Sequence, residues 1–206
     1  MDKDSQLHKI LAKYLPPDSV DYAHDLLWKY GIQLHIKKPR VTKFGDYRPP
    51  KPGEPHRISI NNDLNPFAFL VTFLHETAHL VNHENHGFRV SPHGKEWKET
   101  FHIVSSPILK THILPNDVLS ALSGYLNNPA ASSCSDPILF RTLKNYDNRP
   151  EHIVLLESLP LGSEFRIRES RKFVKGEKIR SRYRCQEMNT GKVYLVHGLM
   201  EVEIVL

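Results

Sequence analysis

The chain has 206 residues, of which 39% are hydrophobic and 25% are charged. This composition supports one or two folded domains and excludes a chain that is disordered throughout. A net charge of +5 permits an acidic partner without requiring one. Two cysteines are too few for a disulfide scaffold or a four-cysteine zinc ribbon, so reduced thiols are the simpler expectation.

The sequence also indicates where the protein resides. Its first residues lack the apolar stretch of a signal peptide. The longest apolar run, around residues 67–74, is far shorter than the roughly 18 residues that a membrane span needs. We therefore expect a cytoplasmic protein with no membrane partner.

Hydrophobic spacing and turn residues divide the first three quarters of the chain into helices and short strands. A long helix is predicted to begin at Asn65-Pro66, where a capping side chain precedes proline, and another at Ser91-Pro92 for the same reason. The expected elements, in chain order, are helices over 7–14 and 20–30, a strand over 32–41, a loop over 45–55, a strand over 57–61, helices over 65–83 and 91–101, and shorter helices over 116–126 and 136–146.

From residue 152 the apolar residues alternate with polar ones, and residues 189–191 form a plausible hairpin turn. This pattern predicts a small antiparallel β unit at the C-terminus. The predicted fold class is α+β, with the long helix and its neighbours packed on a small sheet and the β unit after them. The predicted domains are 1–105, a helical linker region over 106–150, and the β unit over 151–206.

The strongest chemical signal is the run His75-Glu76-Thr77-Ala78-His79 on the long helix. Residues four apart on a helix lie almost in register, one turn above the other, so both imidazoles can reach one metal ion. Glu76 emerges beside them and can act as a base without being a ligand. The pattern predicts one zinc ion per chain with a general base next to it.

A catalytic zinc usually takes a third protein ligand and leaves one position open. His83 continues the four-residue spacing, but it lies about 12 Å along the helix axis from the first histidine. His93 is expected in the first turn of the next helix, which a loop could fold back onto the site. We favour His93 as the third ligand, with His86 as the alternative.

The residues that follow the motif resemble a known family. Together with 75–79, the segment Pro92-His93-Gly94-Lys95-Glu96-Trp97-Lys98 resembles the SprT-like metallopeptidases, which include the bacterial SprT proteins and the eukaryotic protease Spartan. Segments 40–48 and 56–61 are similar to the strands that precede the metal helix in that family. The resemblance covers roughly residues 5–105.

The resemblance implies a zincin-like site in which His75, His79 and His93 bind zinc and Glu76 activates water to hydrolyse peptide bonds. For Spartan-like members it implies cleavage of proteins crosslinked to DNA. Many family members carry a C-terminal zinc ribbon. This chain has only Cys185 in its last 56 residues, so it would be a variant without the ribbon cysteines.

Two features of a protease site stay open at this level. Tyr47, His86 and Arg89 are candidates for the group that stabilises the oxyanion. The strand over 57–61 could accept an extended substrate as an added strand, or it could be an ordinary inner strand.

Positive charge is concentrated in residues 165–184, with nine Lys or Arg against two Glu, while the rest of the chain sums to −2. On strands, alternating arginines share one face and suit contacts with the phosphates of DNA or RNA. A solvated face is the plainer interpretation. The candidate contacts are Arg166, Arg168, Arg180, Arg182 and Arg184.

Taken together, these patterns predict a zinc-dependent metalloendopeptidase that acts on protein or peptide substrates, including DNA-associated or DNA-crosslinked proteins. The alternative is a zinc-containing nucleic-acid-binding or regulatory protein without protease activity. A hydrolase that acts on a non-peptide amide would share the same motif. An intact Glu76 favours the enzyme, because a purely structural zinc site needs no base there.

Overall fold

The computed structural model describes residues 3–40, 42–129, 136–167 and 171–205. The chain is α+β, as predicted, and divides into two compact units, Met1–Asp147 and Asn148–Leu206. Each unit has its own hydrophobic core. Among the described residues, no helix is long and apolar enough to cross a membrane.

The first unit contains a three-stranded sheet. Its strands are β1 (Ile32–Lys37), β2 (Gly45–Arg48) and β3 (His56–Asn61), in the order β1-β3-β2. The central strand β3 runs parallel to β1 and antiparallel to β2. The strand predicted over 32–41 thus ends at Lys37, and the predicted loop over 45–55 begins with a strand.

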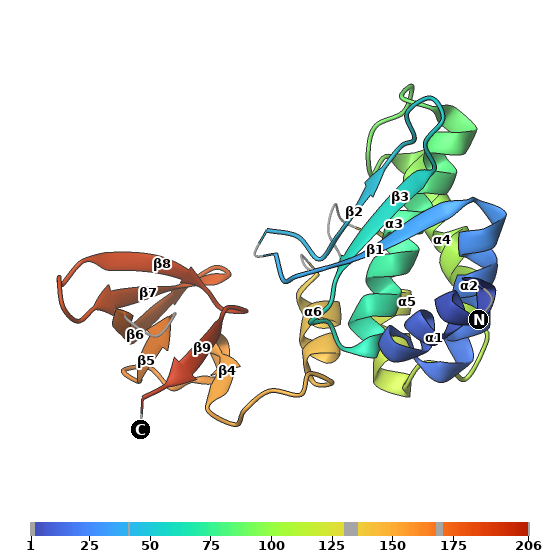
Figure 1. Ribbon diagram of the computed structural model, residues 1–206. Helices are drawn as coiled ribbons and strands as arrows, with labels where there is room; N and C mark the ends of the chain where they lie inside the picture. The colour runs from blue at the N-terminus through green and yellow to red at the C-terminus, as the bar shows by residue number, and fades with distance from the viewer. Residues whose placement is uncertain (1–2, 41, 130–135, 168–170, 206) are drawn as a thin grey trace. The chain divides into compact units, whose positions relative to one another are not determined.

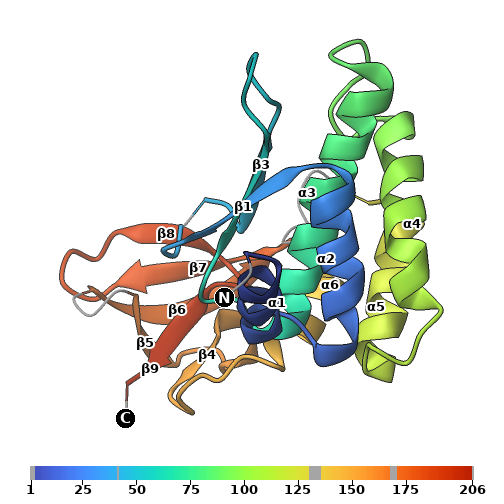
Figure 2. The same cartoon turned by 45° about the vertical axis from the view of Figure 1, so that its right-hand side comes forward.

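Helices cover one face of this sheet (Figures 1 and 2). Helix α2 (Val20–Lys29) contacts β1, and helix α3 (Pro66–His86) contacts β2 and β3. Ile58 and Ile60 on β3 are fully buried in the helix-covered core. Because side chains alternate along a strand, the residues between them point to the opposite face.

Helix α3 begins where its sequence predicts. The Asn65 side-chain oxygen accepts hydrogen bonds from the backbone N–H groups of Phe67 and Ala68, and Pro66 occupies the first turn. The helix continues to His86, one turn further than expected. Its middle is buried on nearly all sides, because it packs against β2, β3 and helix α4 (Lys95–Leu109).

The region over 106–150 differs from the separate linker that its short helices predict. Helices α5 (Asn116–Leu126) and α6 (Pro137–Lys144) share the core of the first unit. The Asn65 side-chain amide also donates to the Leu143 carbonyl at 2.8 Å, which ties the start of α3 to the end of α6. The remaining helices of this unit are α1 (Lys3–Tyr14) and η1 (Pro17–Ser19).

The second unit is a six-stranded antiparallel sheet with one short helical turn, as the alternating pattern predicts. The predicted hairpin turn at 189–191 is confirmed. Gly191 has a positive φ of 69°, a conformation that glycine adopts at little cost. The strands, in the sheet order β4-β9-β5-β6-β7-β8, are β4 (Ile153–Leu155), β9 (Glu201–Ile204), β5 (Glu164–Ile167), β6 (Arg171–Ile179), β7 (Arg182–Glu187) and β8 (Val193–His197), with η2 (Leu156–Ser158) after β4.

Packing holds this second unit together. Its buried core consists of Leu156, Phe165, Phe173, Tyr183, Cys185, Val196 and Val202. Cys185 is buried with a free thiol, while Cys134 lies outside the described residues. The Phe165 and Phe173 rings stack at 5.6 Å across β5 and β6. A zinc ribbon is therefore not needed to explain how this unit stays folded.

Candidate metal centre

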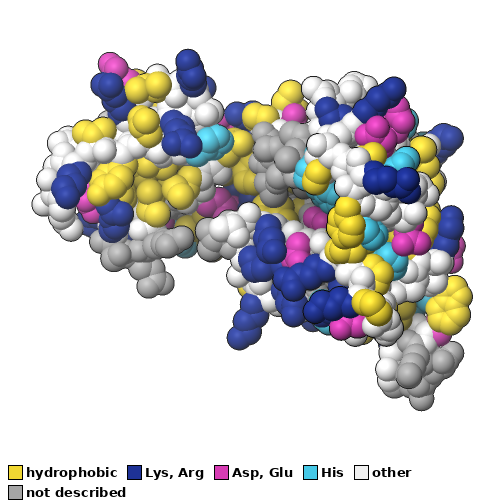
Figure 3. Space-filling model, turned by 90° about the horizontal axis from the view of Figure 1, so that it is seen from above, with side chains coloured by type: hydrophobic (Ala, Val, Ile, Leu, Met, Phe, Trp, Pro, Cys, Tyr) yellow, Lys and Arg dark blue, Asp and Glu magenta, His cyan; other side chains and the backbone are white. Residues whose placement is uncertain are grey.

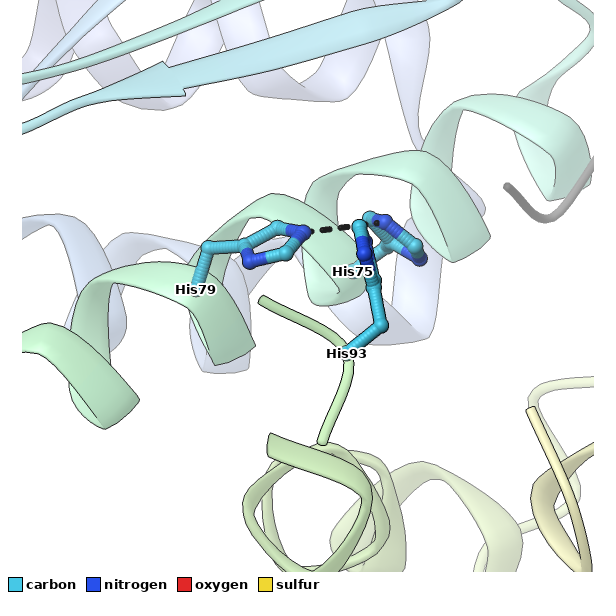
Figure 4. A group of neighbouring side chains, drawn as sticks. All are labelled: His75, His79 and His93. Atoms are coloured by element: carbon cyan, nitrogen blue, oxygen red, sulfur yellow. Dashed lines mark hydrogen bonds between the residues drawn. The ribbon is translucent and has the colours of Figure 1, made fainter. Parts of the chain in front are cut away.

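Three histidines converge at the middle of α3 (Figure 4). His75 and His79 project from successive turns of the helix, and their Nε2 atoms face each other at 3.2 Å. His93 reaches them from the loop before α4. One ring nitrogen from each residue lies within 4.8 Å of the others, so the three could hold one metal ion. His86, at the end of α3, does not belong to this group.

The spacing of the first two nitrogens suits zinc. Tetrahedral zinc with Zn–N bonds of about 2.0–2.1 Å places two ligand nitrogens about 3.3 Å apart. The observed 3.2 Å between Nε2 of His75 and Nε2 of His79 is close to that value. Buried Nε2 of His93 has no hydrogen-bond partner among the described residues. A buried ring nitrogen without a partner is costly unless something else binds it.

The sequence predicts His93 in the first turn of a helix, but the structure places it before the helix begins. Helix α4 starts two residues later, at Lys95, and Gly94 caps it without a side-chain bond. His93 instead has a positive φ of 61°, within a turn that the Gly94 N–H closes onto the Ser91 carbonyl. A non-glycine residue in this conformation is strained, which is common where a side chain must be aimed at a functional site.

Trp97 packs against all three imidazoles. Its ring is fully buried, with centroid distances of 4.8 Å to His75, 5.0 Å to His79 and 4.6 Å to His93. It stacks in turn on Phe101. The first turn of α4 therefore positions the ligand set by packing, since no hydrogen bond to the three rings other than the one between them is found among the described residues.

Burial holds the imidazoles in the neutral form that binds metals. Burial, together with the charges of neighbouring rings, lowers the pKa of His75 and of His79 to about 3; the neighbours are His79 and His93 for His75, and His93 for His79. Burial also lowers the pKa of His93. Near neutral pH the site therefore has almost no protons to release when a metal binds.

This burial makes the metal-free protein sensitive to acid. The folded pKa values near 3 lie below the ordinary 6.5, so the unfolded chain binds protons that the folded chain does not. The stability that the neutral histidines contribute to the folded state should be fully present above about pH 6.5 and should be lost progressively as the pH falls toward 3. Thermal melting of chelator-treated protein between pH 7.5 and 5 measures this. The double variant His75→Gln/His79→Gln should show a flatter profile, and an equally steep one would contradict the assignment.

Glu76 lies beside the ligands, buried under β2. Burial, together with the charge of Asp46, raises the pKa of its carboxyl to about 8. The backbone N–H of Tyr47 donates to the carboxylate and, with the charges of Arg40 and Lys43, acts in the opposite direction. A carboxyl group with a raised pKa can accept and return a proton near neutral pH. A dication held by the histidines would lower this pKa again.

Gly45 allows β2 to approach Glu76 this closely. A Cβ atom at Gly45 would lie 2.7 Å from Cγ2 of Thr72 and 2.9 Å from Cγ of Glu76. Both distances are too short for any side chain without a shift of the helix or the strand. The glycine thus places the strand backbone directly on the carboxylate.

The site opens into a hollow of about 280 Å³ lined by Gly45, Asp46, Tyr47, His75, Glu76, His79 and His93. The strand predicted to accept a substrate, over 57–61, is the inner strand β3 and pairs on both sides. The strand next to the metal centre is β2, and among the described residues only one of its edges is paired with another strand. A free edge of this kind can pair with an extended peptide.

The three candidates for oxyanion stabilisation differ in position. Tyr47 lines the hollow, and its hydroxyl is 2.9 Å from Nδ1 of His56, whose Nε2 lies 3.2 Å from the Glu84 carboxylate. His86 and Arg89 do not line the hollow. Tyr47 is therefore the one of the three that the structure brings to the centre.

The arginines of the basic segment lie in the second unit. Arg182 and Arg184 are exposed on one face of β7, as predicted. Arg180 is not on that strand: it lies in the turn before it, with a positive φ of 55°. Arg166 on β5 lies 3.9 Å from Glu203, and Arg168 lies outside the described residues. Of Arg180, Arg182 and Arg184, which alternate in the sequence and were expected to share one strand face, only the last two do so, because the β6–β7 hairpin turns at Arg180.

The position of segment 45–48 beside the metal centre is not evident from its composition. Glycine and proline surround this segment, and these residues usually mark loops. The alternation of Asp46, Tyr47 and Arg48 is too short to predict a strand, and only the family resemblance of segment 40–48 indicates one. Tyr47 is a candidate from the sequence, but only the pairing of β2 with β3 and its contact with α3 reveal that Gly45 belongs to the site.

Comparisons with known proteins add no relative. No family model matches the chain, and neither a curated protein nor a solved structure is significantly similar to it. What bears on function is therefore the site itself: three neutral imidazoles, a buried carboxylate beside them, and a free strand edge along the same hollow.

Proposed function

We propose that the protein is a zinc-dependent metalloendopeptidase of the SprT-like kind, with a zincin-like site. One observation carries the proposal. The nitrogens of three neutral histidines converge next to buried Glu76 in a hollow bordered by the free edge of β2. A structural zinc site has no need of a carboxylate base or of an open strand edge. A hydrolase that cleaves an extended chain needs both.

In this proposal His75, His79 and His93 hold zinc. When bound, zinc would act as a Lewis acid that lowers the pKa of water and polarises a carbonyl group. Glu76 accepts the proton of the attacking water and returns it to the leaving amine. The Tyr47 N–H keeps the carboxylate oriented toward the ligands. The free edge of β2 binds the substrate backbone as an added strand, which fixes the scissile bond with little dependence on side chains.

The cleavage assay uses the full chain loaded with zinc and an unfolded protein as substrate, with and without single- and double-stranded DNA. We expect cleavage that a chelator abolishes and that added zinc restores. DNA is included because the proposed substrates are proteins bound or crosslinked to nucleic acid, which exposed Arg182 and Arg184 could engage. A zinc-loaded protein that cleaves nothing under either condition would favour the alternative, a zinc-containing nucleic-acid-binding or regulatory protein.

Substitution of Gly45 tests the close approach of β2 to Glu76. Gly45→Ala should lower stability by about 1–3 kcal/mol, as overpacking of a buried contact does, and should reduce cleavage more than zinc content. Thermal melting, zinc analysis and the cleavage assay measure the three effects.

The double variant Gly45→Ala/Thr72→Ser provides the control. Serine removes the Cγ2 atom at 2.7 Å and keeps the hydroxyl that donates to the Ala68 carbonyl. We expect stability to recover in part while cleavage stays low, because the contact with Glu76 remains. Full cleavage by Gly45→Ala would show that the carboxylate does not need this approach.

A further inference from the structure

A second concentration of positive charge lies in the first unit. Residues 37–57 contain seven Lys or Arg against two acidic residues, a net charge of +5 in 21 residues. This segment runs from the end of β1 through β2 into β3. From this segment, Gly45, Asp46 and Tyr47 line the hollow of the metal centre, and none of the seven cations does.

The sheet collects these cations on the face away from α3. Register places His35 and Asp46 on either side of Ser59, and Arg48 opposite Arg57. Ile58 and Ile60 point into the helix-covered core, so the alternate residues point outward. Figure 3 shows Lys and Arg side chains crowded together at its lower centre, where this sheet lies. A hollow of about 120 Å³ on this face is lined by His35, Lys37, Arg40, Asp46, Arg48, Arg57 and Ser59.

The acidic groups present do not neutralise this face. Three cations, Arg40, Lys43 and Arg48, form ion pairs with the same carboxylate, that of Asp46. Burial on its own would raise the pKa of Asp46, but hydrogen bonds from Ser59 and from these three cations hold it well below its ordinary value. Asp46 is therefore fully ionised, and its one negative charge still faces three positive charges.

Two further groups at the hollow can donate to an anion. Among the described residues, no carboxylate lies within ion-pair distance of the exposed Lys37 ammonium. Nε2 of His35 is buried and has no hydrogen-bond partner in the same part of the chain. Arg57, in contrast, pairs with Glu54 at the edge of the hollow. The surplus of donors over acceptors is what an oxyanion site requires.

We propose that this outer face of the three-stranded sheet binds the phosphate backbone of a nucleic acid. The hollow takes one phosphate, and the neighbouring phosphates contact cations outside it, such as exposed Lys38 and Lys51. The spread of charge over 21 residues exceeds what a single phosphate needs. A membrane is the less suitable partner, because residues 32–61 include none of the strongly exposed large hydrophobic side chains found among the described residues.

This site places the nucleic acid on the unit that carries the metal centre. Strand β2 contributes Gly45 and Tyr47 to the hollow of the metal centre and Arg48 to the hollow on the opposite face, while Asp46 lines both. Binding here does not depend on the proposed protease activity. If both proposals hold, a protein bound to the nucleic acid would be brought to the catalytic unit by the same strand that borders its active site.

The test is fluorescence anisotropy of labelled single-stranded and duplex DNA with the full chain at a series of salt concentrations. The variant Lys37→Gln/Arg48→Gln removes two exposed cations at the hollow and leaves Arg40, which bonds to five groups around it. We expect the Kd to rise about tenfold and the slope of log K against log salt to fall by about 2. Unchanged melting temperature and zinc content show that the fold is intact.

The matched control is Lys13→Gln/Lys110→Gln, which removes the same charge from exposed positions on α1 and just after α4. It should bind DNA almost as the unaltered chain does. Each comparison is repeated in an Arg182→Gln/Arg184→Gln background, so that the second unit cannot mask the effect. If the variant and the control lost DNA affinity equally, the loss would follow from net charge and not from the hollow, and the proposal would be overturned.

Two further arms identify the ligand. Inorganic phosphate at low millimolar concentration should compete weakly, because it offers one phosphate where the backbone offers several. Vesicles rich in phosphatidylserine should bind the unaltered chain and the variant equally. Binding of phosphate with no binding of DNA, or a loss in the variant that is confined to vesicles, would overturn the assignment to nucleic acid.

Discussion

Replacement of His93 by alanine should remove the zinc from the protein. We expect about one zinc per chain in the unaltered protein and almost none in His93→Ala, because two imidazoles four residues apart on one helix bind zinc far more weakly than a three-ligand set. Elemental mass spectrometry on the dialysed, purified protein measures the content. The effect is expected to be close to complete because His93 supplies the only ligand that does not come from α3.

Two variants separate loss of a ligand from loss of local structure. His93→Gly suits the positive φ of 61° better than histidine does, so the turn should be retained while the zinc is lost. His86→Ala removes the alternative ligand at the end of α3 and should keep its zinc. Zinc that survives in both His93 variants, or that is lost in His86→Ala, would mean that the three histidines in Figure 4 are not the ligand set.

Replacement of Glu76 by glutamine should leave the zinc in place and abolish most of the activity. Glutamine has almost the same shape, and its side-chain carbonyl can still accept the hydrogen bond from the Tyr47 N–H. It cannot accept a proton from water, so the rate of cleavage should fall by about 10²–10⁴-fold. Cleavage of an unfolded protein, followed at matched zinc content, measures the change.

Glu76→Gln also separates the proposed enzyme from its alternative. The buried carboxyl of Glu76 has a raised pKa, so the amide should cost little stability and can increase it. An enzyme would then lose cleavage while keeping its melting temperature, zinc and nucleic-acid binding. Cleavage that persists in a zinc-loaded Glu76→Gln preparation would point to another base or to a contaminating protease, and the mechanism would be wrong.

The metal helix could be predicted because its signals are local. Asn65-Pro66 starts α3 through hydrogen bonds to residues two and three positions away. The four-residue spacing of His75 and His79 puts their rings on one side of any helix, whatever packs around it. The alternation after residue 152 and the turn at 189–191 predicted the β unit for the same reason, since a strand and its hairpin are set by neighbouring residues.

The rest of the site depended on contacts between distant residues. The turn that aims His93 has no sequence signal, because Ser91-Pro92 is equally typical of a helix start, and packing of Trp97 against the three rings places α4 later. Nothing near Gly45 reveals that its missing side chain makes room for Glu76, 31 positions further along.

The sequence alone determined that this chain carries a long helix with two histidines four residues apart and a glutamate beside the first, followed by a β unit. Tertiary structure decided which strand borders the site, that α5 and α6 belong to the first core, and that the cations of 37–57 share one face. Hydrogen bonds such as that from Asn65 to Leu143 join residues 78 positions apart. Local periodicity cannot encode such pairs, because the closure of long loops is rewarded only when the whole core forms.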